Sequence, residues 1–324
     1  MYSIFAYAFS ISLICLLAIT WSPLGRLVLD RPNQRSLHAA PVPRTGGIAI
    51  LAGASFSLMF VELPEQIPLL IALALGGVSF LDDLFNLPSL VRLIAHLAGA
   101  AIVLALCPPR PDLPLAMLLL LGIGWITNLF NFMDGSDGLA GGMAVFGFGT
   151  YAIAASNAGG NDLSALCLVL TLATLAFLLF NFHPARIFMG DVGSVPLGFL
   201  AGTLGFLGWQ EGLWPIWFPI LVFSPFFVDA TLTLLKRVLR REKIWKAHRE
   251  HYYQKLVRMG FGHRKTALLE YLLMLGIGVL SLEIREAPAE IQAVSLSIIA
   301  AIYFGLVIWI DTSWAKFTAE SAQK

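Results

Sequence analysis

Long, nearly uninterrupted apolar runs dominate this chain and leave few folds open to it. A helix that spans a bilayer needs about 20 apolar residues, or fewer where interfacial side chains flank it. Eleven segments meet this description, at approximately residues 3–21, 46–62, 67–81, 90–107, 114–130, 138–156, 163–181, 194–209, 213–235, 267–284 and 292–310. The runs lack the alternating pattern of outer-membrane strands, which predicts helices rather than a barrel. We therefore expect an all-α, polytopic integral membrane protein with about 11 transmembrane helices.

Composition and cysteine usage support one membrane domain. Hydrophobic residues make up 58% of the 324 positions and charged residues only 13%, far from the balance of a soluble domain. The cysteines are scattered through predicted helices without CxxC spacing, so we expect packing roles for Cys15, Cys107 and Cys167. No internal repeat is evident. We expect a single transmembrane domain over residues 1–324, with loops on one side at about 22–45, 82–92, 128–138, 182–194 and 236–266.

Positive charge gathers in alternate loops. Nineteen of the 21 Lys and Arg residues fall in those loops and the C-terminal tail, whereas the opposite loops hold Arg110 and Arg285. The positive-inside rule assigns the basic side to the cytoplasm, with the N-terminus outside and the C-terminus cytoplasmic. All polar motifs described below fall on that same side. Insertion signalling explains most of these cations, but the dense run from Lys236 to Lys265 also favours an anionic substrate.

Two adjacent acids, Asp82 and Asp83, follow an apolar segment in SFLDDLFNLPSLVR. Neighbouring carboxylates raise each other's proton affinity, so the pair indicates a nearby cation or a group that exchanges protons. A solvated helix end is the alternative for this pair taken alone.

A polar ladder at spacing three lies between two apolar segments in NLFNFMDGSDGLAGG. Its members are Asn128, Asn131, Asp134 and Asp137. Residues three apart lie near each other on a helix, so the two asparagines can face a cleft that the acids reach from the next turn. Such oxygen ligands suit Mg²⁺, which usually shares its coordination with substrate phosphates. Interhelical hydrogen bonding by the asparagines is the structural alternative.

The motif NFHPARIFMGDVGSVPLG places Asp191 in a tight polar turn before an apolar segment. Backbone N–H groups at such a helix start can face an anion. Asp191 as a simple N-cap is the structural alternative, but we expect Ser194 to cap the helix, which frees Asp191 for a metal. Phe188 could stack on a flat base.

A fourth motif, KIWKAHREHYYQKLVRMGFGHRK, holds His248, Arg249 and His251. Two histidines three apart could bind zinc, but a third ligand is missing from the pattern. A cluster of imidazoles and a guanidinium that grips phosphate is more economical. An amphipathic loop helix on anionic lipid is the structural alternative.

Together the four motifs resemble the polyprenyl-phosphate N-acetylaminosugar-1-phosphate transferases, the MraY and WecA type of membrane enzyme in glycosyltransferase family 4. The resemblance runs from about Asn33 to Arg264 and includes PNQRSLHAAPVPRTGG. It implies transfer of a sugar 1-phosphate from a UDP-sugar to undecaprenyl phosphate, release of UMP, and dependence on Mg²⁺ (Mn²⁺ possible). It also implies a bacterial inner-membrane location with the active site on the cytoplasmic face, and a homodimer. No nucleic-acid partner is expected.

The resemblance also assigns roles to residues. Asp191 matches the principal magnesium ligand, with Asn131 as a second, and Phe188 matches an aromatic that stacks on uracil. Asp82 and Asp83 match the pair assigned to the lipid phosphate, where Asp82 positions or deprotonates the attacking oxygen. The remaining matches are to the nucleotide and metal pocket (Asp134, Asp137) and to the sugar-phosphate end (His248, Arg249, His251). Arg44 in PRTGG either adds a phosphate contact or orients the loop, and Asn128 is expected to bind substrate from its place in the ladder. The family motif is HxH or HHH, whereas this chain reads HREH.

Three choices stay open at this level. Direct attack by the lipid phosphate is preferred over a covalent aspartyl-phosphate route. The motifs look more like those of enzymes that initiate O-antigen or other surface polysaccharides, with a UDP-N-acetylhexosamine donor that could be a 6-deoxy sugar, than like those of the enzyme that uses UDP-N-acetylmuramoyl-pentapeptide. A transporter or flippase is the alternative of another class, and Asp229 is the acid closest to a midplane role.

Overall fold

The computed structural model describes residues 2–22, 28–30, 41–58, 66–108, 110–243 and 248–322. Within these ranges nine helices are long and apolar enough to cross a membrane. They are α1 (Tyr2–Trp21), α3 (Gln66–Phe85), α4 (Ser89–Leu106), α5 (Leu113–Met133), α6 (Leu139–Asn157), α7 (Asn161–Asn181), α8 (Asp191–Gln210), the run from α11 to α12, and α13 (Ala289–Ala322). The predicted all-α polytopic architecture is confirmed at this level.

Shorter elements complete the chain. The helical ones are α2 (Gly46–Leu58), α9 (Trp217–Val222), α10 (Ser224–Leu239), α11 (Tyr252–Leu256), the π-helical turn η2 (Val257–Phe261) and α12 (Gly262–Ile284). A two-residue antiparallel ladder joins β1 (Leu29–Asp30) to β2 (Val42–Pro43), with Leu29 opposite Pro43 and Asp30 opposite Val42. This ladder fixes the chain just before α2.

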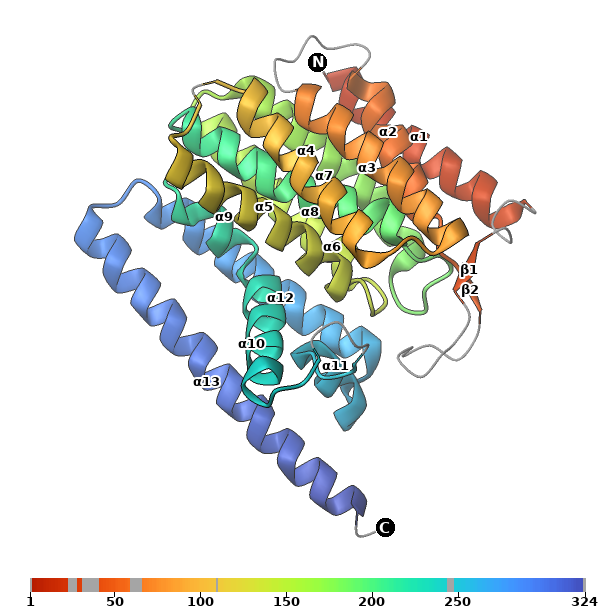
Figure 1. The fold of residues 1–324 in the computed structure, drawn as a ribbon, viewed down its shortest axis with the longest axis vertical. Helices are drawn as coiled ribbons and strands as arrows, with labels where there is room; N and C mark the ends of the chain where they lie inside the picture. Colours follow the sequence, from red (N-terminus) through yellow and green to blue (C-terminus); the bar gives the residue numbers. More distant parts are fainter. Residues whose placement is uncertain are drawn as a thin grey trace.

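The centre of the molecule is α8. It is buried along almost its whole length and packs against α3 and α5, with α2 and α6 also in contact. Around it, α6 packs against α7, and α1 packs against α2 and α7 (Figure 1). Because α8 begins at Asp191, the first polar side chain of that helix is attached to the best-packed element of the protein.

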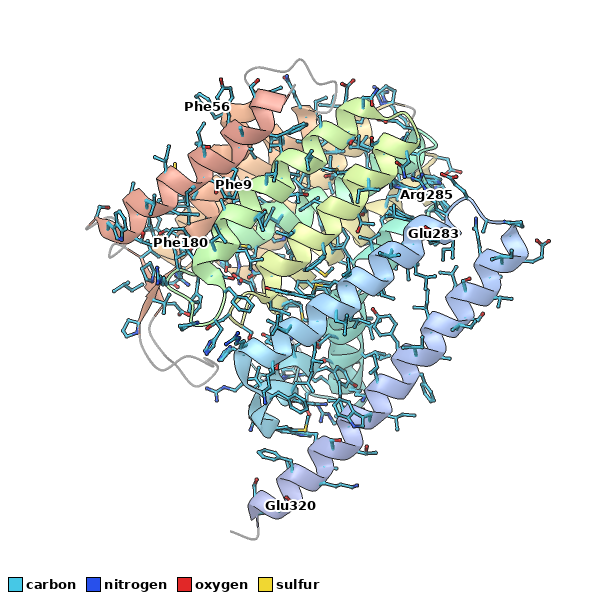
Figure 2. The ribbon with its side chains drawn as sticks, turned by 180° about the vertical axis from the view of Figure 1, so that it is seen from behind. Phe9, Phe56, Phe180, Glu283, Arg285 and Glu320 are labelled. Atoms are coloured by element: carbon cyan, nitrogen blue, oxygen red, sulfur yellow. The ribbon has the colours of Figure 1, made fainter. Side chains whose placement is uncertain are left out.

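The last helix, α13, lies on the outside of the molecule (Figure 1). Large apolar side chains along it are exposed, including Ile302, Phe304 and Trp309. Figure 2 shows the Glu320 end of α13 extending beyond the bundle. Glu283 and Arg285, at the C-terminal end of α12, lie at the other end of the molecule. An exposed apolar helix of this kind is what a lipid-facing position requires.

The predicted helix over residues 213–235 is wrong as one continuous element. The chain forms the short helix α9, breaks at Phe223 and continues as α10, which runs at an angle to the bundle helices (Figure 1). Pro225 lies in the first turn of α10 and has no N–H for the preceding turn, which explains the break. The break directs α10 toward α11.

Two boundaries also differ from the prediction. Residues 82–85 were expected in a loop, but α3 continues to Phe85, so both acids of the pair lie in its last turn. The helix α8 begins at Asp191 with Gly190 as its N-cap residue, so Ser194 does not cap it. Apolar runs identify the long helices, whereas polar last turns of helices look like loops in a sequence.

Candidate active site

The PRTGG segment and the FMG segment cross in direct backbone contact. The N–H groups of Gly46 and Gly47 donate to the carbonyls of Phe188 and Met189, both at 2.9 Å, and the Phe188 N–H donates to the Pro43 carbonyl at 2.7 Å. A Cβ atom on Gly47 would lie 2.3 Å from the Cα of Gly193. Only glycine permits this approach, and it brings the starts of α2 and α8 together.

The carboxylate of Asp191 stands at this crossing. Its Oδ2 accepts a hydrogen bond from Asn131 Nδ2 at 3.2 Å and lies 3.5 Å from Nη1 of Arg92. The other end of the Asn131 amide accepts from Ser194 Oγ at 3.4 Å. As the structure has it, Asn131 orients Asp191. Asn128 instead donates to the Gly124 carbonyl of its own helix at 2.7 Å.

Asp82 and Asp83 point to different arginines. Asp82 Oδ2 lies 2.9 Å from Arg92 Nη1, and Asp83 Oδ1 lies 3.1 Å from Arg44 Nη2. Successive helical residues are about 100° apart, which explains the divergence. Arg92 thus bridges Asp82 and Asp191, so α3, α4 and α8 meet at one guanidinium. In the structure Arg44 pairs with the carboxylate of Asp83, and its expected contact with a phosphate stays a prediction.

Asp134 ends α5 beside the start of α8. Burial and the charge of Asp191 raise the pKa of Asp134 well above its ordinary value, although a hydrogen bond from the Gly190 backbone opposes the change. Asp30, on β1, adds to this increase. Asp134 therefore binds a proton more readily than an ordinary carboxylate does, and the negative charge of Asp191 is one cause.

Asp137 belongs to a neighbouring cluster. Its Oδ2 accepts from His183 Nδ1 at 2.6 Å and from the Ala185 N–H at 3.1 Å. His263 Nδ1 lies 2.8 Å from Ser136 Oγ, and its ring stacks on that of His183 with centroids 5.4 Å apart. The sequence analysis missed both histidines, because nothing in the local pattern links residues 80 positions apart.

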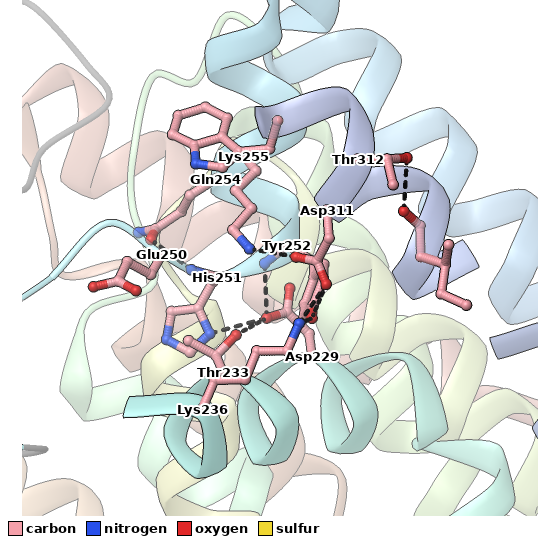
Figure 3. Close-up of polar contacts among 12 residues, drawn as sticks. Asp229, Thr233, Lys236, Glu250, His251, Tyr252, Gln254, Lys255, Asp311 and Thr312 are labelled. Carbon is pink, nitrogen blue, oxygen red and sulfur yellow. Dashed lines mark hydrogen bonds and ion pairs between the residues drawn. The ribbon is translucent and has the colours of Figure 1, made fainter. Parts of the chain in front are cut away.

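The histidine loop is held by Asp229, which comes from α10. The carboxylate of Asp229 accepts the backbone N–H groups of Tyr252 and Tyr253, both at 2.9 Å, and faces His251 Nδ1 at 3.0 Å (Figure 3). The His251 N–H in turn donates to Gln254 Oε1 at 3.3 Å. Asp229 therefore satisfies the start of α11, which is the work of a helix cap. These three contacts occupy the Asp229 carboxylate, whereas ion coupling in a transporter would need a carboxylate that can bind the ion.

The two histidines of the HREH motif lie together, with ring centroids 4.9 Å apart. Burial, the neighbouring His251 and the charge of Arg237 lower the pKa of His248 to about 4. His248 is therefore a neutral imidazole at neutral pH. Arg249 is half-buried, and phosphate binding by this motif stays a prediction.

Tyr253 connects the histidine loop to the acids. Its hydroxyl donates to the Phe132 carbonyl at 3.5 Å, and the ring of Phe132 stacks on His251 at 6.4 Å between centroids. A Cβ atom on Gly135 would lie 2.2 Å from the Tyr253 hydroxyl oxygen. The loop therefore rests on the turn that carries Asp134. Phe188, two residues before Gly190, is half-buried.

The residues present fit a magnesium ion. Asp82, Asp83 and Asp191 lie beside two guanidiniums, and Asp134 is close enough to Asp191 to feel its charge. Asp83 Oδ2 is buried without a hydrogen-bond partner among the described residues. In the described part of the chain, no three His, Cys, Asp or Glu side chains form a metal cage by themselves. That agrees with Mg²⁺, which takes one or two carboxylates and completes its shell with waters and substrate phosphates.

The chain is similar in sequence to known membrane transferases. The model of the family described as Glycosyl transferase family 4 matches residues 66–208. The chain is 31% identical over 309 residues to a probable undecaprenyl-phosphate N-acetylglucosaminyl 1-phosphate transferase of Bacillus subtilis (strain 168), covering 86% of this chain and 85% of the relative.

Two further relatives are more distant. An undecaprenyl-phosphate alpha-N-acetylglucosaminyl 1-phosphate transferase of Yersinia pestis is 27% identical, over 87% of this chain and 84% of the relative. A phospho-N-acetylmuramoyl-pentapeptide-transferase of Staphylococcus saprophyticus is 26% identical, over 80% and 89%. With a relative that is 31% identical over 86% of its length and two further relatives aligned along most of it, the chain belongs to the polyprenyl-phosphate sugar-phosphate transferase family.

Proposed function

We propose that this protein transfers an N-acetylhexosamine 1-phosphate from a UDP-sugar to undecaprenyl phosphate and releases UMP. One observation carries the proposal: Arg92 bridges Asp82 and Asp191, so acids from separate helix ends share one polar site. The reaction joins two anions that repel each other, and it needs positive charge next to carboxylates that can orient the attacking group.

The guanidiniums and the acid pair would receive the acceptor. Arg92 and Arg44 are already positioned by Asp82 and Asp83, so a lipid phosphate that enters exchanges one anionic partner for another. Asp82 then positions or deprotonates the phosphate. An acceptor oxygen forms a bond to the β-phosphorus of the donor, and the bond from that phosphorus to the bridging oxygen breaks, so UMP leaves with the electron pair. We favour this direct attack over an aspartyl-phosphate route.

Mg²⁺ (Mn²⁺ possible) would be held by Asp191, with Asn131 as an orienting or second ligand, and Asp134 and Asp137 would complete the nucleotide pocket. When bound, the ion would neutralise pyrophosphate charge. Phe188 would stack on the uracil at one side of the site. His248, Arg249 and His251 would meet the sugar-phosphate end from the other side, because Tyr253 holds their loop against the α5–α6 turn.

The printed names of two relatives favour UDP-N-acetylglucosamine as the first donor to test. The product would then initiate a surface polysaccharide such as O-antigen. UDP-N-acetylmuramoyl-pentapeptide is the competing donor, since a third relative is named for it.

We further propose the membrane topology that the charge bias predicts. The nine long helices, α2 and the α9–α10 segment would give eleven crossings, with the N-terminus outside and the C-terminus cytoplasmic. The protein would lie in the bacterial inner membrane as a homodimer of single-domain chains, with its active site facing the cytoplasm. Arg44 and Arg92, from two of the basic loops, lie beside Asp83 and Asp82, which supports this orientation.

The test is to incubate the purified protein with Mg²⁺, undecaprenyl phosphate and a panel of UDP-sugars and to measure UMP. We expect release with one N-acetylhexosamine donor, and only when the acceptor is present. No release from any donor by folded protein would contradict the proposal and favour a transporter.

A further inference from the structure

A polar cavity of about 350 Å³ lies between α10, α11, η2 and the C-terminal part of α13. We call it the basic cavity. It is on the other side of α11 from the acids: Tyr253 faces the α5–α6 turn, whereas Tyr252 donates to Asp311 of α13 at 3.3 Å and Lys255 lies 3.0 Å from Asp311 (Figure 3). A volume of this size can hold a small polar ligand.

The lining of the basic cavity is strongly cationic. Its basic side chains are Lys236, Arg240, Arg249, Lys255 and Arg258. Its carboxylates are Glu250 and Asp311. Five cationic groups against two anionic groups leave a formal excess of three positive charges. A phosphate group is the common biological anion that such an excess would attract.

The internal contacts leave part of this excess in place. Lys236 and Lys255 share the single carboxylate of Asp311, and Arg240 pairs with Glu250 and with Glu242, which lies outside the lining. Arg258 lies over the ring of Trp314 with 4.6 Å to the centroid. In the part of the chain that the structure describes, no carboxylate forms an ion pair with Arg258.

The depth of the cavity matches the headgroup layer of a bilayer. Asp311 follows the first residue of α13, Ala289, by 22 positions, which is about 33 Å along a helix. The hydrocarbon core of a bilayer is about 30 Å thick. Trp314 and Lys316 come next, and such side chains anchor helices at the interface. The exposed apolar face of α13 leads from the lipid toward this position.

We propose that Lys236, Lys255 and Arg258 bind the phosphate of an anionic phospholipid headgroup in the basic cavity, at residues other than those proposed to contact the substrates. Arginine and lysine recognise phosphate through charge-assisted hydrogen bonds, and cations near a membrane surface attract anionic lipid. A lipid there connects α13 to α11, whose start is held by Asp229 together with His251. The inference goes beyond the transferase reaction and does not depend on it.

The test uses the full-length protein in detergent and measures lipid binding by native mass spectrometry together with the melting temperature. The probes are phosphatidylglycerol, phosphatidylcholine and inorganic phosphate. We expect phosphatidylglycerol to bind and to raise the melting temperature. A double variant, Lys255→Gln with Arg258→Gln, should bind it about tenfold more weakly, as expected for loss of charged hydrogen bonds. The matched control Lys316→Gln removes a nearby exposed charge and should bind as the unaltered protein does.

A variant that should bind phosphatidylglycerol more tightly distinguishes loss of the binding site from misfolding. Asp311→Asn removes the internal anion that competes for Lys236 and Lys255, so phosphatidylglycerol should bind more tightly. A protein that merely misfolds would lose binding in both variants. Equal binding of the two lipids, equal behaviour of the double variant and Lys316→Gln, or full stabilisation by inorganic phosphate alone would each overturn the proposal.

Discussion

Two regions of the molecule hold functional side chains by different means. Around α8, backbone hydrogen bonds and the contact between Gly47 and Gly193 fix the positions of Asp191 and Arg44. Around α10 and α11, a side chain fixes the positions instead, because the Asp229 carboxylate holds His251 and the start of α11. A site on packed backbone is rigid, whereas one held by charged side chains responds to charge and to neighbouring lipid. We therefore expect the chemistry to depend on the first region and substrate capture on the second.

The largest effect should follow Asp191→Asn, in the first region. The change removes the carboxylate that Asn131 and Arg92 orient. We expect UMP release to fall on the order of 10³-fold, as for the loss of a principal electrostatic group.

Asp112→Asn is its matched control. Asp112 caps α5 at the opposite end of that helix, where its side chain accepts from Leu115. Asparagine caps helices nearly as well as aspartate, so activity and stability should both persist. An equal loss of activity in the two variants would show that Asp191 has no specific role in the reaction.

Gly47→Ala should have the next largest effect. The new Cβ would lie 2.3 Å from the Cα of Gly193, so the α2 and α8 starts must separate. A displacement of about 1 Å at reacting groups can cost about 100-fold in rate, and we expect a loss of that order in kcat. Gly77→Ala is the control, because its Cβ would meet nothing within 4 Å. If both variants kept full kcat, the backbone crossing would not position the site.

Asp229→Asn tests the second region. The substitution weakens acceptance of two backbone N–H groups and removes the charge beside His251. We expect KM for the UDP-sugar to rise about tenfold with a smaller change in kcat, and stability to fall by about 2 kcal/mol. Asp162→Asn changes an exposed acid in the first turn of α7 and should leave both constants unchanged. A fall confined to kcat would place Asp229 with the chemistry instead.

The smallest effect concerns pH and Asp134. The pKa of Asp134 is higher in the folded protein than its ordinary value of 3.8, so above about pH 4 the folded state binds a proton that the unfolded state has released. Its contribution to stability is thus present at low pH and is lost as pH rises through the folded pKa. Asp134→Asn removes this dependence, so its melting temperature relative to the unaltered protein should increase with pH. A difference that stays constant from pH 5 to pH 8 would contradict the raised pKa.

Sequence patterns identified the apolar segments and the acids, because both signals are local. The partners of those acids could not be predicted from local patterns, because they come from other helices. Arg92 lies ten positions from Asp82 but one helix away, and Asp137 meets His183 and His263 only after α7 and α12 reach the α5–α6 turn. Pro225, however, was a visible signal for the break between α9 and α10.

The expected partnership of the two asparagines shows the same limit. Spacing three places Asn128 and Asn131 near each other on α5, yet only Asn131 lies at the depth of Asp191, and Asn128 bonds within its own helix. Residues 32–40 of the PNQRSLHAAPVPRTGG motif lie outside the described residues, so their part in the site stays a prediction. Helical spacing gives the face of a residue, whereas its depth depends on how the helices pack.

The central claim, that acids from separate helix ends form one divalent-cation and donor site, is tested most directly by electron paramagnetic resonance with Mn²⁺. The signal of free Mn²⁺ is followed as purified protein is titrated in the presence of UDP-N-acetylglucosamine. The account predicts one bound ion per chain in the unaltered protein and in Asp112→Asn, and none in Asp191→Asn. Unchanged Mn²⁺ binding by folded Asp191→Asn would contradict it.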